Sequence, residues 1–274
     1  MKVFISSDME GATGVTGWDD VSPGKAPFER FRRLLTGDVN AAIEGAFEAG
    51  ADEVLVNEAH DGMRNILLEE LDKRATMISG FRGKRLAMME GVDESFDAAF
   101  LVAYHARAGT DAAILNHTFF TSIHNFWIDG VLVGETGLSA TLAGHYGVPV
   151  VLVTGDDKVS EEAKGLLGTV ETAVVKEGIS RYSANCLPPD QSSSRIREAA
   201  KRALSLKVDP YRPEKPVKFA IEFQSPDMAA SASSVPGVVR EGPRTISCTA
   251  EDVLATWNVI FPSMMLATTA EQRS

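Results

Sequence analysis

The sequence predicts an α/β fold, with a mostly parallel sheet and flanking helices, plus a smaller α+β unit at the C-terminal end. Two observations favour the parallel sheet. Short apolar runs alternate with helical patterns as far as about residue 155, which is typical of strands joined by crossover helices. The runs are also continuously apolar, as expected of strands that are covered on both faces.

Four apolar runs are expected to form strands of this sheet, at residues 3–5, 54–56, 98–103 and 150–153. After the first run, apolar residues recur at intervals of three and four from Phe28 to Ala46. This spacing predicts an amphipathic helix. Pro27 suits the first turn of that helix, and Gly50 suits its end.

Two regions depart from this pattern. In segment 126–133, Asp129-Gly130 separates two apolar runs and favours a tight hairpin turn. After Asp157, strands are expected at 170–175, 217–223 and 245–248, with a proline-rich segment between the first two. Thr249 and Asp252 resemble a capping box that opens a C-terminal helix, which Pro262 should bend or end. We therefore expect an α/β domain at 1–157 and a smaller α+β domain at 158–274.

The composition limits the possible partners and location. Of the 274 residues 44% are hydrophobic, as in ordinary globular proteins, and the net charge is 27 − 38 = −11. This charge argues against nucleic acid or an anionic membrane as the main partner. No run reaches the roughly 20 apolar residues of a membrane span, and the N-terminal residues do not read as a signal peptide. Cys186 and Cys248 lack metal-type spacing, so a cytoplasmic protein is expected.

Polar residues that can bind metal ions follow three of the expected strands. Asp8 and Glu10 come after the first strand, His60 after the second and His105 after the third. Ligands of open parallel sheets bind just beyond the carboxyl ends of the strands, so these side chains should converge. Glu135 follows the hairpin and begins the next helical stretch. One Asp, two Glu and two His suit zinc with open positions for water and substrate.

Each of these residues alone also has a simpler explanation. A carboxylate at a strand end commonly caps the next helix, a histidine there is often structural, and Glu135 could be a solvated residue at a helix start. No HExxH, CxxC or phosphate-loop motif supports the pattern. His145 reads as a structural residue at a helix end, and His124 lies in the loop before the hairpin, where it could line the cleft. Only the joint pattern favours a metal site.

Several longer stretches carry a family resemblance. They are "DMEG", "EVLVNEAHDGM", "GVDESFDAAFLVAYHARAGT", "LNHTFF", "VGETGLSATLAGHYGVPVVLVTGDD" and "TAVVKEGISR". The chain resembles the zinc-dependent D-aminopeptidase family, whose members are also labelled dipeptide transport proteins. The likeness runs nearly end to end and is strongest between residues 1 and 185.

The resemblance implies a site for two Zn²⁺ ions per subunit, carried by the 1–157 domain. Asp8 would bridge both ions, Glu10 would bind one, and His60, His105 and Glu135 would complete the ligand set. The family's catalytic histidine falls on His117 of "LNHTFF". Family members assemble into rings, so the resemblance also implies a homo-oligomer, a ring-shaped decamer.

These features lead to a functional hypothesis. The protein is expected to be a metallo-aminopeptidase that hydrolyses short peptides from the free N-terminus, with a preference for N-terminal D-residues. A water activated by two metal ions would attack the peptide bond, and His117 would transfer protons. The alternatives are another metal-dependent amidohydrolase, a phosphoester hydrolase, or a peptide-binding or transport-accessory protein.

Overall fold

The computed structural model describes residues 1–81 and 85–271, within which the chain forms two sheets. The larger sheet has seven strands in the order β3-β2-β1-β4-β7-β8-β9, and the smaller has five in the order β11-β12-β10-β5-β6. The strands of the larger sheet are β1 (Lys2–Ser7), β2 (Glu53–Glu58), β3 (Ala75–Ile78), β4 (Ala98–Tyr104), β7 (Val150–Asp156), β8 (Glu171–Ser180) and β9 (Ser183–Cys186).

The larger sheet is parallel except for its last strand. β1 pairs in parallel with both β2 and β4, and the parallel pairing continues outward to β3 and β8, while β9 runs antiparallel to β8. The expected α/β fold and its four central strands are confirmed. The strand order progresses in opposite directions from β1 and from β4, so the topological switch lies between these two strands.

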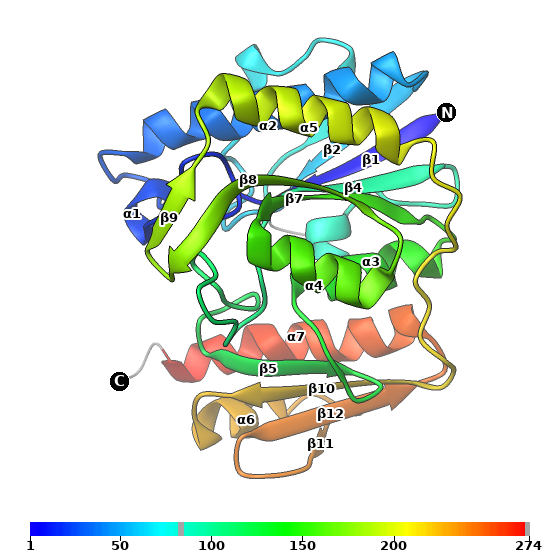
Figure 1. The fold of residues 1–274 in the computed structure, drawn as a ribbon. Coiled ribbons are helices and arrows are strands. Elements are labelled where there is room, and N and C mark those ends of the chain that lie inside the picture. Colours follow the sequence, from blue (N-terminus) through cyan, green and yellow to red (C-terminus); the bar gives the residue numbers. More distant parts are fainter. Residues whose placement is uncertain (82–84, 272–274) are drawn as a thin grey trace.

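Helices cover both faces of this sheet (Figure 1). α2 (Phe28–Glu48) and α5 (Pro189–Ala203) pack side by side on one face, and α3 (Glu135–His145) and α4 (Asp157–Leu167) lie on the other. α2 confirms the expected helix. α5 was not predicted, because Pro188-Pro189 and the serine run obscure its start and its buried apolar residues begin only at Ile196.

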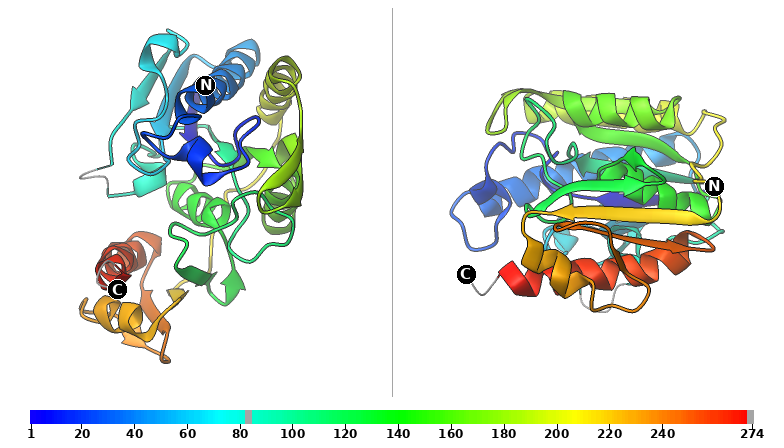
Figure 2. Two further views of the ribbon diagram at one scale, coloured as in Figure 1. Left: turned by 90° about the vertical axis from the view of Figure 1, so that its left-hand side faces the viewer. Right: turned by 90° about the horizontal axis from the view of Figure 1, so that it is seen from below.

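The smaller sheet is antiparallel and has helices packed against it. Its elements are β5 (Ile123–Ile128), β6 (Val131–Leu132), β10 (Val217–Phe223), β11 (Val239–Arg240), β12 (Thr245–Ala250), α6 (Pro226–Ala232) and α7 (Val253–Glu271). β5 and β6 form the expected hairpin, and its turn residues Asp129 and Gly130 have positive φ values of 49° and 80°. Figure 2 shows this unit beside the larger sheet and its helices.

One expectation about the C-terminal helix is wrong, and another holds at most in part. Thr249 is not the cap, because it lies in β12; instead the Asp252 carboxylate accepts a hydrogen bond from the backbone N–H of Ala255 at 2.9 Å. Of the two effects expected of Pro262, it does not end the helix, since α7 continues to Glu271; a bend at this position stays a prediction. The described helix therefore starts one turn later than expected and runs past the proline.

The two sheets do not divide the chain at residue 157. β8 and β9 follow this position but complete the larger sheet, whereas β5 and β6 precede it and belong to the smaller sheet. The chain leaves the larger sheet after β4, forms the hairpin, and returns through α3 to β7. The division into domains at residue 157 stays a prediction, but it does not coincide with the sheets.

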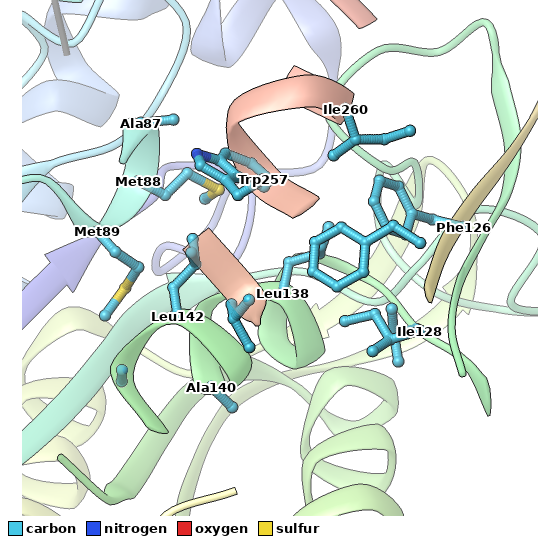
Figure 3. Packing of buried hydrophobic residues seen from close by; sticks show 14 of the residues in the cluster. Ala87, Met88, Met89, Phe126, Ile128, Leu138, Ala140, Leu142, Trp257 and Ile260 are labelled. Carbon is cyan, nitrogen blue, oxygen red and sulfur yellow. The ribbon is translucent and has the colours of Figure 1, made fainter. Parts of the chain in front are cut away.

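α7 joins the two units through a shared core. Its residues Trp257 and Ile260 belong to the same buried cluster as Leu138 of α3 and Phe126 of β5 (Figure 3). The stretch Val253–Ala270 is long and apolar enough to cross a membrane by length and composition alone, with a mean hydropathy of 1.3 and 39% of it buried. The buried side chains at Trp257, Ile260 and Met264 instead fit a helix that packs one face on a core.

The loop after β1 packs tightly on the end of β4. The backbone N–H groups of Asp8 and Gly11 donate to the carbonyl oxygens of Val102 and Ala103, at 2.9 and 2.8 Å. A Cβ atom at Gly11 would lie 2.0 Å from the carbonyl oxygen of Tyr104. Only glycine therefore lets the two strand ends approach this closely.

This contact generates a prediction for Gly11→Ala. The added methyl group must push the loop away from β4, and we expect the free energy of unfolding to fall by at least about 2 kcal/mol. Chemical denaturation would measure the change. Gly37→Ala in α2 is the matched control: no atom lies within 4 Å of its added Cβ, so the helix propensity of alanine should leave stability unchanged or raise it by up to about 1 kcal/mol. Equal stability of the two variants would contradict this account.

Candidate metal centre

Six polar side chains converge where the larger sheet switches direction. They come from the segments that follow β1, β2 and β4 and from the start of α3, and all are at least nine-tenths buried. They are Asp8, Glu10, His60, His105, His117 and Glu135. The structure thus brings together all five residues predicted as ligands and the predicted catalytic histidine. Their role as metal ligands stays a prediction.

The distances within the cluster are short and arranged around Asp8. Nδ1 of His60 lies 3.4 Å from Oδ1 of Asp8 and 2.9 Å from Oε2 of Glu10. Nε2 of His105 lies 3.4 Å from Oδ2 of Asp8 and 3.4 Å from Oε2 of Glu135. Oδ1 of Asp8 therefore faces His60, and Oδ2 faces His105.

Each imidazole ring is oriented by a backbone carbonyl on its outer side. Nε2 of His60 lies 3.0 Å from the carbonyl oxygen of Val21, Nδ1 of His105 lies 2.9 Å from that of Ala106, and Nδ1 of His117 lies 2.8 Å from that of Leu115. Because a carbonyl only accepts, the outer nitrogen must carry the proton. In the neutral ring the inner nitrogen then presents a lone pair to the carboxylates, which is the orientation of metal-ligating histidines.

The residues fit a zinc site by their chemistry and spacing. Among the described residues, Oδ2 of Asp8 and Nε2 of His105 are buried without a hydrogen-bond partner. Ligand atoms 2.0–2.2 Å from a tetrahedral Zn²⁺ would lie about 3.3–3.6 Å apart, close to most of the distances seen here. Among the described residues, three groups keep their ligand atoms within 4.8 Å of one another. Two of them, Asp8–His105–Glu135 and Asp8–Glu10–His60, share Asp8, and the third is Glu10–His105–His117.

Electrostatics show the cost of this cluster without a cation. Burial, and then the neighbouring Glu10 carboxylate, raise the pKa of Asp8 to about 8. Burial lowers the pKa of His60 and His105, but the surrounding carboxylates outweigh it and hold both pKa values well above the usual range. Burial would raise the pKa of Glu10, yet the three histidines hold it well below its usual value. Burial and mutual repulsion of the carboxylates therefore favour protonation of Asp8 and of the two histidines beside it.

Neighbouring residues position the ligands. The side chain of Asn65 donates to Glu58 and to the carbonyl oxygen of His60, at 2.7 and 2.8 Å, and fixes the loop after β2. Glu135 is the first residue of α3, where the helix dipole favours a carboxylate, and its Oε1 accepts from the backbone N–H of Phe119 at 2.6 Å.

His117 differs from the other two histidines. Burial and the charge of His105 lower its pKa, so its ring is neutral at neutral pH. Nε2 of His117 lies farther from the carboxylates, 3.8 Å from Glu10 and 4.0 Å from Glu135. The ring stacks on His105 at 4.1 Å between centroids, and Trp18 meets its side at 5.4 Å. An inward, unprotonated nitrogen beside the cluster is suited to accept a proton.

The cluster borders a cleft of about 650 Å³. Asp8, Glu10, His60, His117 and Glu135 lie in its lining, together with apolar side chains from both units of the fold. The apolar lining residues include Trp18, Met88, Phe119, Phe120, Phe261 and Met265. The last two come from α7, so the C-terminal unit forms part of the cleft wall.

The sequence did not identify these wall residues. Phe261 and Met265 lie more than 120 residues from the last predicted ligand, and their pattern resembles any apolar helix. His124 and His145 lie outside the cluster, as expected for His145, and neither lines the cleft. His124 is exposed and His145 is the last residue of α3.

Comparison with known proteins gives one consistent result. The family model described as D-aminopeptidase, peptidase M55, matches residues 1–261. The D-aminopeptidase of Bacillus subtilis (strain 168) is 37% identical over 270 residues, which cover 97% of this chain and 98% of that protein. A solved structure described as the Zn-dependent D-aminopeptidase DppA from Bacillus subtilis, a self-compartmentalizing protease, superposes with a TM-score of 0.94 and covers 98% of both chains at 37% identity.

The raised pKa values predict that zinc binding releases protons. At pH 7 the metal-free cluster holds protons on Asp8, whose pKa is about 8, and on His60 and His105. Metal ligands must be deprotonated, so we expect at least one proton to leave as zinc binds, and the affinity to rise with pH from 6 to 8. Calorimetric titration of zinc in buffers of different ionisation enthalpy measures this release. A binding heat that is the same in every buffer would contradict the prediction.

Proposed function

The chain belongs to the D-aminopeptidase family of zinc-dependent peptidases, and from that premise we propose that it removes N-terminal D-residues from short peptides. The observation that carries this proposal is the buried cluster of three carboxylates and three inward-facing imidazoles. Among the described residues, the ion-pair partners of these carboxylates are histidines alone. A divalent cation satisfies the cluster better than protons do.

We propose that each subunit holds two zinc ions that share Asp8. This arrangement is supported by the two oxygens of Asp8, which face His60 and His105 separately. Glu10 and His60 would complete one set of ligands, and His105 and Glu135 the other. When bound, two zinc ions would supply an activated water as nucleophile and would polarise the scissile carbonyl.

His117 would transfer protons in this reaction. Its lowered pKa leaves Nε2 free to accept a proton from the attacking water and to return it to the leaving amine. The bond from Nδ1–H to the carbonyl oxygen of Leu115 holds this tautomer. Proton transfer of this kind contributes typically 10²- to 10⁴-fold to the rate.

The cleft favours a peptide over an anionic substrate. In the described part of the chain, its lining contains no lysine or arginine, whereas cationic side chains would favour a phosphoester substrate. The apolar side chains would contact the substrate's side chains and exclude water. A preference for D-residues would be steric, because inverting Cα exchanges the side chain and the hydrogen atom within a shaped pocket.

We further propose a homo-oligomer in the cytoplasm, assembled as a ring-shaped decamer. The self-compartmentalizing character described for DppA supports the oligomer. Both cysteines are free, Cys248 buried and Cys186 half-buried, which suits a reducing compartment.

The proposed reaction predicts different rates for two dipeptides. With zinc present, D-Ala-D-Ala should be hydrolysed at least tenfold faster than L-Ala-L-Ala, because a single placement of the side chain fits the cleft. Release of free alanine measures both rates, and a chelator should abolish both. Equal rates would refute the stereochemical preference, and turnover that survives complete zinc removal would refute the metal chemistry.

Two histidine variants separate metal binding from proton transfer. His117→Ala should retain zinc but lose 10²- to 10⁴-fold in kcat, whereas His60→Ala should lose zinc and activity together. Elemental analysis and turnover are measured on the same samples. His145→Ala, at the end of α3 and away from the cleft, is the control and should keep both. Near wild-type turnover in His117→Ala would remove this residue from the mechanism.

A further inference from the structure

Lys176 is buried inside the larger sheet although it carries a charge. It lies on β8 with 1% of its surface exposed, opposite Asp156 of β7 and Cys186 of β9. A buried ammonium group is costly unless every proton finds an acceptor. The lysine therefore needs a specific explanation.

The acceptors are three carbonyl oxygens of one loop. Nζ of Lys176 donates to the backbone oxygens of Glu10, Ala12 and Val15, at 2.6, 2.9 and 2.8 Å. An ammonium group has three donors, so the match is complete. The loop follows β1 and includes Gly11, Gly14 and Gly17, residues that give a chain high conformational freedom when it is not anchored.

A second buried group holds the same loop from α2. The carboxylate of Asp38 accepts from both the backbone N–H and the hydroxyl of Thr13, each at 2.8 Å. Lys176 thus holds the loop by donating to its carbonyl oxygens, and Asp38 holds it by accepting from the N–H and hydroxyl groups of Thr13. Of the two anchors, only Lys176 contacts Glu10 itself.

We propose that Lys176 is a positioning residue that fixes the backbone of Glu10, so that its carboxylate is preorganised to bind metal. The bond at 2.6 Å sets the position of the Glu10 peptide group, and the side chain then reaches His60 at 2.9 Å. Residues that orient ligands in this way typically contribute 10- to 100-fold to metal affinity. The inference rests on the proposed role of Glu10 as a ligand.

A purely structural role for Lys176 differs from a positioning role in its expected effect on zinc affinity. Loss of a buried hydrogen-bonded group lowers stability wherever it lies, but only a positioning residue also lowers the zinc affinity of molecules that remain folded. Zinc affinity of the folded protein, compared with a variant of similar stability, therefore separates the two roles.

The test uses Lys176→Met in the full chain, which keeps the length of the side chain and removes the three donors. Zinc affinity is measured by competition with a chromophoric chelator, and the Tm of the metal-free protein is measured in parallel. We expect zinc affinity to fall at least tenfold. Ile246→Ala, at a fully buried position of β12 in the smaller sheet, should lower Tm but change the affinity less than twofold.

Two further variants make the outcome decisive. If Lys176→Met does not fold, Lys176→Arg takes its place, since it keeps the charge but its planar donors cannot match the three carbonyl oxygens. Affinity within twofold of wild type in the folded variant overturns the proposal. Glu10→Gln tests the premise separately: if this variant binds zinc as wild type does, Glu10 is not a ligand and the proposed metal site is at fault.

Discussion

The structure depends on placing three carboxylates and three imidazoles together in a buried cluster. Such a concentration of acidic groups is unfavourable by burial and by mutual repulsion, as the raised pKa of Asp8 indicates. The fold compensates through directed contacts: each ring donates outward to a carbonyl, and Glu135 sits at the N-terminus of α3. The negative charge of the carboxylates that these contacts do not balance faces the inside of the cluster, where a cation would bind.

Topology explains why these residues meet. Parallel strands bring their carboxyl ends to one edge, and β1, β2 and β4 are neighbours around the point where the winding direction reverses. The close approach of Gly11 to β4 and the anchoring of the loop by Asp38 and Lys176 then set the distances. The sheet topology brings the six polar side chains to one edge, and the loop contacts fix the distances between them.

The sequence predicted the central sheet and the cluster because both have local signals. Continuously apolar runs indicated the central strands, and the polar residues directly after them indicated the site. The edge strand β3 and helix α5 were missed, since partial exposure weakens the apolar pattern of the first and prolines obscure the start of the second. Likewise, no local signal marks Lys176, Phe261 or Met265 as neighbours of the site, because only tertiary contacts bring them there. His117 was identified through family resemblance, as its surrounding sequence is an irregular loop.

Part of the cleft wall comes from a different part of the chain than the polar cluster. The polar cluster depends on strand ends of the larger sheet, whereas Phe261 and Met265 project from a helix whose other contacts lie mainly in the smaller unit. Substitutions on that helix face would therefore reshape the cleft without moving a residue of the polar cluster. The face of α7 that lines the cleft is therefore the place where substrate selectivity can be redesigned separately from the polar cluster.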